Sequence, residues 1–466
     1  MTILEELYSS KKHMQDLQIK EISFGINKVI VINIQTVSSS SQTNEFILNY
    51  LSNRSLFKND ISPLLKDINY HIPSVSFINI KDSEIYNYLF DGFSIIIYKD
   101  DIIACETKAL LDRGINEPSS EPTIKGPKDS FNENYNTNIG LIRKRIKNKN
   151  LYLKEFILGT LTKTRTCIMY MNNLVDKELL NDVINKLSNI KTDKILDTFY
   201  IKELLKKENK STFPTIKSTE KPDIIAKSLT EGKICIISEN SNNALIIPTF
   251  FIDYFYNSED NYQKPIFAFF VRFIRMLALF ITIFAPSIYI SLTTYDQSIL
   301  PVKLFTNFQL QRSGVPFPTL IEAFLLMLTF ELLYEADALT PSSRGTSLSI
   351  LGALVLGDAA VSAGIVSPIM VIVVAITSIT SIFFAFQDFQ SSIRLYRYSL
   401  MILSSLFGLI GIIFGFLIII TKISSIKSFG KPYLIPFAPL IKYNKKYSIK
   451  HGLLVQNIDK GEQWKR

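Results

Sequence analysis

The sequence predicts an α/β N-terminal soluble region of two small subdomains, followed by an α-helical, multi-spanning membrane domain. Three observations support this prediction. The first half of the chain alternates β-rich runs with helical periodicity, the second half contains apolar runs long enough to cross a bilayer, and 47% of the 466 residues are hydrophobic. The net charge of +9 is concentrated at the end, because residues 1–264 hold 34 basic and 33 acidic residues whereas residues 422–466 hold 10 and 2.

Two hairpin patterns and one helix pattern define the soluble half. The stretches 92–107 and 232–248 are each two β-rich runs around a polar turn, and residues 173–190 carry apolar residues at helical spacing. Two polar, proline-bearing stretches, 114–138 and 208–223, interrupt this half. The predicted units are a first α/β subdomain 1–113, a polar linker 114–139, a second α/β subdomain 140–262, a helical membrane domain 263–421 and a basic tail 422–466.

The membrane domain contains apolar segments close to the length of about 20 residues that a bilayer requires. The predicted segments are about 266–292, 317–336, 346–366, 367–386 and 398–421. Five crossings would place the two chain ends on opposite sides, yet a neutral soluble region without a preceding apolar signal core and a basic tail both favour the cytoplasmic side. One segment is therefore predicted to be re-entrant or broken. The glycine-rich stretch 352–364 is the candidate, because irregular backbone at membrane depth needs protein or water around it.

Asp358 is the one charged residue between residues 345 and 386. A carboxylate at bilayer depth costs about 2.5–3.5 kcal/mol on insertion scales, so Asp358 is expected to face a bundle interior or water. Small residues around it recur at a four-residue spacing that lets helix backbones approach closely. These candidate close-packing residues are Ala353, Gly357, Ala360 and Gly364. A structural bond to a neighbouring helix and a place in an ion path are both open roles for Asp358.

Three glutamates complete the set of candidate pore, gating or interhelix polar residues. Glu331 and Glu335 are four residues apart and share a helical face, whereas Glu322 lies about 180° from Glu331 around an ideal helix. Glu331 is expected to pair with an arginine of a neighbouring segment. The candidate partners are Arg272, Arg275 and Arg344. A static ion pair and a pore or gating role are equally compatible with this pattern.

The sequence contains no pattern of residues that would carry catalysis. No GxSxG, HExxH, P-loop or GxGxxG motif is present, and the three cysteines have no CxxC spacing. We therefore predict that the chain is not an enzyme and that it binds no cofactor or metal. The basic run 142–150 has no interleaved aromatic residues, which favours a solvated helix face over a nucleic-acid partner.

Motifs of one known family recur over about 350 residues of the chain. Residues 117–146 read EPxxExxIxGPxxxFxE followed by TNxxLIRxRI, and residues 219–237 read TExPDxxxxxLxEGxxxI. Further matching stretches are 170–179, 244–265, 286–301, 315–336, 345–379 and 428–439. Together these stretches resemble the A subunit of bacterial spore germinant receptors, the GerA-type family of spore germination proteins.

The resemblance implies a multi-pass subunit of the spore inner membrane whose N-terminal domain faces the cytoplasm, or spore core. It implies two partners, a transporter-like B subunit and a lipoprotein C subunit, and a ring of A subunits around an ion pathway for monovalent cations. The implied function is the relay of germinant binding to ion release, as an ion channel or channel-forming subunit. A non-conducting scaffold of the complex and a secondary transporter of a small nutrient are the alternatives.

The chain departs from the family pattern at three places. Residues 295–298, YDQS, stand where the family usually has Phe-His-x-Glu, and Asp358 stands where it usually has Gln or a similar neutral residue. Tyr334 occupies the position of an arginine. The missing arginine is expected to leave the helix end around Glu331 and Glu335 more acidic.

Overall fold

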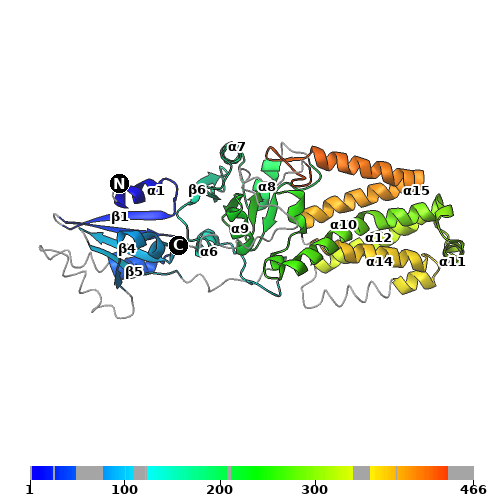
Figure 1. Ribbon diagram of the computed structural model, residues 1–466, viewed down its shortest axis with the longest axis horizontal. Coiled ribbons are helices and arrows are strands. Elements are labelled where there is room, and N and C mark those ends of the chain that lie inside the picture. Colours follow the sequence, from blue (N-terminus) through cyan, green and yellow to red (C-terminus); the bar gives the residue numbers. More distant parts are fainter. Residues whose placement is uncertain are drawn as a thin grey trace.

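Two sheet-containing units follow one another along the longest axis of the computed structural model and lead into a helical bundle (Figure 1). The structure describes residues 3–24, 27–48, 77–99, 101–109, 121, 123–206, 211–339, 357–384 and 386–438. The predicted fold class, an α/β region with two sheets followed by apolar helices, is confirmed. The number of membrane crossings and the domain boundaries stay predictions.

The first unit is a five-stranded antiparallel sheet with the strand order β1-β2-β4-β5-β3. Its strands are β1 (Leu17–Phe24), β2 (Asn27–Ile34), β3 (Phe77–Asn79), β4 (Phe93–Tyr98) and β5 (Asp101–Glu106). Its helical segments are α1 (Ile3–Lys11), α2 (Ser40–Thr43), the π-helix η1 (Asn44–Leu48), the 3₁₀ turn η2 (Asp82–Glu84) and α5 (Ile85–Phe90). The hairpin predicted over 92–107 is confirmed as β4–β5, with Tyr98 opposite Asp101.

The second unit is again a five-stranded antiparallel sheet, with the order β6-β7-β9-β10-β8. Its strands are β6 (Leu151–Leu158), β7 (Thr164–Met171), β8 (Lys217–Thr219), β9 (Ile234–Ser238) and β10 (Ala244–Ile247). Its helical segments are α6 (Tyr135–Arg145), α7 (Lys177–Ser188), α8 (Thr198–Lys206), α9 (Pro222–Thr230), η3 (Phe251–Phe255) and η4 (Ser258–Asn261). The predicted hairpin over 232–248 and the predicted helix within 173–190 are confirmed as β9–β10 and α7.

The second sheet has a core on each face, which follows from the two-residue alternation of strand side chains. Cys167 and Met169 of β7 pack with α6 and α9 on one face. Ile168 and Tyr170 of the same strand pack with α7 and α8 on the other. The strand therefore reads as a nearly continuous apolar run, and both sheet faces are covered by helices.

The two soluble units share one topology. Numbered within each unit, the strands lie in the order 1-2-4-5-3, and a helix precedes the fourth strand in both, namely α5 and α9. Neither the β-rich runs nor the helical spacing of the sequence predicted this repeat. The third strands of the two units are both three residues long. The units differ in the helices between the second and third strands, because the second unit has α7 and α8 there, whereas the described residues of the first unit have the shorter α2 and η1.

The helical bundle extends from the second unit to the opposite end of the molecule, where α11 lies (Figure 1). Its segments are α10 (Pro265–Thr294), η5 (Gln297–Ile299), α11 (Val302–Arg312), α12 (Thr319–Leu339), α14 (Pro368–Ser381), α15 (Gln387–Ser425), β11 (Lys427–Ser428) and β12 (Lys431–Pro432). Within the described residues, α10 and α15 are long and apolar enough to cross a membrane, and α14 is a shorter apolar helix. The helices α10, α12 and α14 overlap the predicted segments 266–292, 317–336 and 367–386.

The bundle is apolar on its outside and contains hydroxyl groups inside. Phe273 of α10 and Ile413 of α15 are more than half exposed. In contrast, Thr282 of α10 is buried and donates a 2.8 Å hydrogen bond to Thr380 of α14. A water-soluble bundle would bury the large apolar side chains instead, so this arrangement suggests that the bundle associates with a membrane.

The helix α15 consists of two halves that fold back on each other at Gly408. Gly408 has φ of 61° and ψ of −143°, and a Cβ on Gly411 would lie only 2.2 Å from the carbonyl oxygen of Leu403. The prediction of one continuous membrane segment over 398–421 is therefore wrong, because the chain reverses direction at Gly408 within it. Hydropathy does not reveal this reversal, since the residues on both sides of Gly408 are equally apolar. The break predicted in 352–364 falls partly outside the described residues.

Both halves of α15 begin or end beside the second soluble unit. In the first half, Ser392 donates a 2.5 Å hydrogen bond to the carbonyl oxygen of Thr212. After the second half, the carbonyl oxygen of Tyr433 accepts a 3.0 Å hydrogen bond from the backbone of Phe251. The hairpin thus returns the chain to the end of the bundle where α10 starts.

Replacing Gly408 with alanine is expected to lower the free energy of unfolding by about 1–3 kcal/mol, the cost of holding a side chain in this backbone region. The new Cβ would also lie 2.7 Å from Oδ2 of Asp296. Thermal unfolding of the detergent-solubilised chain measures the effect. Gly314→Ala is the matched control, because nothing lies within 4 Å of its Cβ position. Equal midpoints for the two variants would contradict the assigned turn.

Candidate functional site

Glu331 of α12 is held by two arginines of α15. Its Oε1 lies 2.8 Å from Nη2 of Arg397, and its Oε2 lies 3.1 Å from Nη1 of Arg394. These arginines are three residues apart and share a helix face. The expectation that Arg272 or Arg275 would pair with Glu331 is therefore wrong, and Arg344 lies outside the described residues.

Tyr334 contributes to the same contact although it replaces an arginine of the family motif. Its ring centroid lies 5.2 Å from the guanidinium carbon of Arg394. Glu335, one turn beyond Glu331, is exposed. The two arginines of α15 supply the positive charge that the motif position lacks, so the acidity expected around Glu331 is compensated from the neighbouring helix.

Glu322 lies near the opposite end of α12 and is fully buried. Its Oε1 accepts hydrogen bonds of 2.6 Å and 2.5 Å from the backbone nitrogen and hydroxyl of Ser367. Ser367 in turn caps α14 by accepting from the backbone of Met370. Oε2 of Glu322 lies 3.8 Å from Nε of Arg312 and has no hydrogen-bond partner among the described residues. One carboxylate therefore ties together α11, α12 and the start of α14.

Asp358 is exposed, at the start of a short helical run over 357–362. It makes no hydrogen bond or ion pair with the described residues. Ala360 packs against the bundle core, and a Cβ on Gly357 would lie 3.6 Å from Cγ1 of Val371. Asp358 therefore does not lie in the described interior of its own bundle, and whether it faces water or a partner stays a prediction.

The remaining candidate close-packing residues have separate outcomes. Gly364 has φ of 65°, and its Cβ position lies 3.4 Å from the carbonyl oxygen of Gly314, so it adjoins the connection after α11. Ala353 lies outside the described residues. Gly357 and Ala360 thus lie against the bundle and Gly364 lies beside a loop, while the predicted close approach of helix backbones through these residues stays a prediction.

Asp260 joins the second soluble unit to α10. Its carboxylate is buried and lies 3.1 Å from Nε of Arg272 and 2.8 Å from Nη1 of Arg275. Arg275 also donates a 2.9 Å hydrogen bond to the carbonyl oxygen of Phe255. The first turns of α10 are thus fixed to the short helices η3 and η4 through charge-assisted bonds, which are stronger than neutral ones.

An aromatic ring extends this cluster toward α9. The Tyr256 ring lies 4.2 Å from the guanidinium carbon of Arg272 and 3.4 Å from the ammonium of Lys227. Burial raises the pKa of Tyr256 to about 12 and lowers the pKa of Lys227 to about 8, the latter against the opposing effect of Glu231. The phenol stays neutral, so the ring acts as an uncharged spacer between two cations.

Two further ion pairs attach the bundle to the second unit. Lys202 of α8 pairs with Asp388 at the start of α15. Lys431 of β12 lies 2.9 Å from Asp176, the residue that caps α7. The second unit therefore contacts α10, the start of α15 and the segment after α15.

Asp296 lies in the YDQS departure from the family motif and belongs to the opposite end of the bundle. Its Oδ2 accepts a 2.6 Å hydrogen bond from the hydroxyl of Ser291 and a 2.9 Å bond from the backbone nitrogen of Leu409. Leu409 is the first residue after the break in α15. Asp296 therefore caps the second half of α15, where backbone N–H groups lack helical partners.

Sequence reasoning missed Asp260, Lys202, Asp388 and Asp296 as functional positions. Each bonds to a residue from a different element, and Lys202 and Asp388 are 186 positions apart. A signal did exist for Asp260, because it directly precedes a membrane-length helix whose first turns carry two arginines. No periodicity or spacing rule links the members of the other pairs.

A model of a known family matches nearly the whole chain. The model is described as Bacillus/Clostridium GerA spore germination protein, and it matches residues 4–460. The chain belongs to the GerA family. The resemblance found in the sequence, to germinant receptor A subunits, is therefore confirmed.

Individual GerA-family relatives agree with this assignment. Spore germination protein KA of Bacillus subtilis is 38% identical over 340 residues, which cover 73% of this chain and 62% of that protein, less than two thirds of its length. Spore germination protein GerQA of Bacillus cereus is 31% identical over 440 residues, covering 94% of this chain and 87% of the relative. Neither is named as an enzyme.

One solved structure is also similar to part of the chain. The crystal structure of the N-terminal domain of the A subunit of the Bacillus megaterium germinant receptor GerK3 aligns with 52% of this chain and 92% of that domain. Its sequence identity is 23% and its TM-score is 0.39.

Proposed function

We propose that this GerA-family chain is the A subunit of a nutrient germinant receptor in the spore inner membrane and relays germinant binding to ion release. In this proposal a transporter-like B subunit and a lipoprotein C subunit are its partners, and several copies form an oligomer that conducts monovalent cations. Its soluble units face the spore core. The start of α10 and the strand β12 lie at the same end of the bundle, and the tail that follows β12 is basic. Basic flanks of membrane segments favour the cytoplasmic side, so both features support that orientation.

The attachment of the second soluble unit to α10 and α15 carries this proposal. Asp260 fixes the start of α10, and Lys202 pairs with the start of α15. The same first half of α15 holds Glu331 of α12 through Arg394 and Arg397. A displacement of the second unit therefore reaches three helices through charged contacts, as a relay requires.

The exposed Asp358 supports the oligomeric part of the proposal. A carboxylate at bilayer depth is costly in lipid unless it meets water or a partner, and Asp358 has no bonding partner in the part of the chain that the structure describes. Its exposure on the bundle surface is consistent with a place beside a second copy or a water-filled path.

Ion flux through the purified chain in lipid vesicles tests the proposal. Glu331→Gln removes the charge held by the two arginines, and Asp358→Asn removes the exposed charge. We expect each to change cation flux by roughly tenfold, the size of a typical coupling between sites. Glu203→Gln, which removes a half-exposed glutamate of α8 in the second soluble unit, is the matched control and is expected to leave flux unchanged.

The outcomes separate the alternatives. Flux that is the same in all three variants would contradict a role for Glu331 and Asp358. If the vesicles show no ion flux although the protein is correctly assembled, conduction would be placed in another subunit and this chain would be a scaffold. Substrate-coupled uptake by this chain alone would indicate a secondary transporter.

A further inference from the structure

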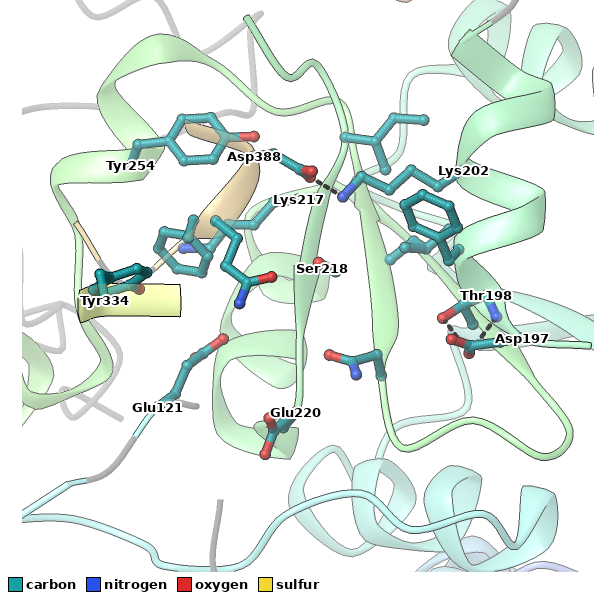
Figure 2. Close-up of a pocket in the computed structure, with 16 residues that line it drawn as sticks. Glu121, Asp197, Thr198, Lys202, Lys217, Ser218, Glu220, Tyr254, Tyr334 and Asp388 are labelled. Carbon is teal, nitrogen blue, oxygen red and sulfur yellow. Dashed lines mark hydrogen bonds and ion pairs between the residues drawn. The ribbon is translucent and has the colours of Figure 1, made fainter. Parts of the chain in front are cut away.

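A polar pocket of about 460 Å³ lies where the second soluble unit meets the bundle (Figure 2). Its walls come from α8, from β8 and its neighbours, from Glu121, and from Tyr334 and residues 386–388 of the bundle. The volume lies within the range of about 300–1,000 Å³ that is typical of small-molecule sites. The site exists only when the soluble unit and the bundle are in contact, because each supplies part of its wall.

The ionisable side chains around the pocket carry an excess of negative charge. They are Glu121, Asp197, Glu220, Asp388, Lys202 and Lys217. Lys202 and Asp388 neutralise each other, and Asp197 accepts hydrogen bonds from the backbone and hydroxyl of Thr198. A ligand that carries a net negative charge would therefore be repelled.

Glu121 is a buried carboxylate without an ion pair among the described residues. Its Oε2 accepts a 3.0 Å hydrogen bond from the hydroxyl of Thr219. Burial raises the pKa of Glu121 to about 7, and Glu220 raises it further, while Lys217, Thr219 and Lys221 oppose the shift. The carboxylate therefore lacks a cation close enough to offset its desolvation.

Lys217 does not fill that role, because it is engaged elsewhere. Its ammonium donates a 3.2 Å hydrogen bond to the carbonyl oxygen of Asp253 and lies 4.0 Å from the ring centroid of Phe386. Burial also lowers the pKa of Lys217 to about 8, against the raising effects of Glu121, Asp253 and Asp260. Near neutral pH Lys217 therefore stays mostly protonated, but its described contacts are with Asp253 and Phe386 and not with the Glu121 carboxylate.

We propose that this pocket binds a small organic cation bearing a primary ammonium group, with Glu121 as its anionic anchor. Tyr334 lies on the same side of the pocket as Glu121 in Figure 2 and offers a ring to the ammonium. A divalent metal is a poorer occupant, because hard cations need several oxygen ligands. The described residues contain no group of three or more carboxylate, histidine or cysteine side chains that could hold a metal ion.

The position of the site gives its occupant a structural effect. A cation on Glu121 that also contacts Tyr334 would bond the second unit to α12, next to the Lys202–Asp388 pair. Binding is therefore expected to stabilise the contact between the soluble unit and the bundle. This inference concerns binding alone and stands whether or not the chain conducts ions.

Calorimetric titration of the full chain in lipid nanodiscs with 1,4-diaminobutane tests the inference. The uncharged analogue 1,4-butanediol and the dianion succinate are the matched ligands, and neither is expected to bind. Glu121→Gln is expected to weaken diamine binding by roughly 10- to 100-fold, the loss expected for a charge-assisted hydrogen bond. Glu203→Gln, on α8 but outside the pocket, is the matched control and is expected to bind as the unchanged chain does.

The pH dependence supplies a second readout. A protonated Glu121 cannot attract a cation, so diamine affinity is expected to rise as the pH increases through about 7. The diamine itself stays charged there, because amine pKa values lie near 10.4. Asp197, Glu220, Asp388, Lys202, Lys217, Tyr254 and Tyr334 also face the pocket, and Lys217, with a pKa lowered by burial to about 8, loses its proton at slightly higher pH than Glu121 does. Loss of the pH dependence in Glu121→Gln would assign it to Glu121 and not to these groups.

Three results would overturn the inference. They are equal binding of the diol, an absence of diamine binding to the unchanged chain, and unchanged affinity and pH dependence in Glu121→Gln. If Glu121→Gln does not fold, Tyr334→Leu replaces it, since it removes a ring of the pocket wall without altering an ion pair. That variant is expected to bind the diamine roughly 2- to 30-fold more weakly, as loss of a cation–π contact predicts.

Discussion

Asp260→Asn is expected to lower the free energy of unfolding by about 3–5 kcal/mol, because it leaves Arg272 and Arg275 buried without their counter-ion. Both guanidinium groups contact the Asp260 carboxylate, whose side chain is 1% exposed. Nη2 of Arg272 already lacks a hydrogen-bond partner among the described residues, so the remaining charge has little alternative compensation. Thermal unfolding of the full chain in detergent, followed by circular dichroism, measures the loss.

The matched control for Asp260 is Asp91→Asn. Asp91 also forms an ion pair, with Lys147, but both side chains are more than 40% exposed. Exposed pairs contribute about 0–1 kcal/mol, so this variant is expected to unfold almost as the unchanged chain does. An Asp260→Asn midpoint no lower than that of Asp91→Asn would show that the junction with α10 does not depend on this carboxylate.

Asp16→Asn is expected to have a loss of similar size, about 3–5 kcal/mol, at the joint between the two soluble units. Asp16 precedes β1 of the first unit, and Arg143 belongs to α6 of the second. Nε and Nη2 of Arg143 donate hydrogen bonds of 2.8 Å and 2.7 Å to the two carboxylate oxygens, and the Arg143 side chain is fully buried. Chemical denaturation monitored by intrinsic fluorescence measures the change.

A neighbouring pair and a double variant make this second prediction specific. Asp129→Asn breaks the Arg145 pair on the same helix, but both of its side chains are about one-fifth exposed, so a smaller loss is expected. Asp16→Leu combined with Arg143→Met removes both charges and is expected to recover most of the stability, because a well-packed apolar pair avoids the desolvation cost. A double variant as unstable as Asp16→Asn would mean that backbone contacts, not the charge, hold the joint.

The local elements of the soluble units were predictable from sequence. The hairpins β4–β5 and β9–β10 follow from β-rich runs around polar turns, and α7 follows from apolar residues at helical spacing. These signals act over a few residues, so one sequence contains them in full. The repeat of strand order was not predictable, because it depends on pairing between strands that are far apart in the chain.

The charged contacts illustrate the limit of sequence reasoning. The basic run 142–150 was expected to be a solvated helix face, but Arg143 within it is fully buried against Asp16. Glu331 was correctly identified as a carboxylate that needs a partner, yet its partners are Arg394 and Arg397. Choosing between arginines requires the rotation of each helix about its axis, and a single sequence leaves that rotation undetermined.

The reversal at Gly408 shows a different limit. Glycines are common in apolar helices, and residues 408, 411 and 415 together resemble a close-packing stripe. Gly411 and Gly415 do pack closely, but their partner is the other half of the same α15, whereas Gly408 lies against Tyr295 and Asp296. The hydropathy profile is identical for one long helix and for a hairpin, so only the backbone angles separate the two.

The attachments between the second soluble unit and the bundle restrict how the bundle can move. Ion pairs hold it at Asp260 on α10, at Lys202 with Asp388 on α15, and at Lys431 with Asp176. Side chains of both parts also share one apolar core, so breaking a single ion pair would not free the bundle to rotate. The two parts are therefore expected to tilt together, and an occupant of the pocket would act on the Lys202–Asp388 pair while the other two pairs stay in place.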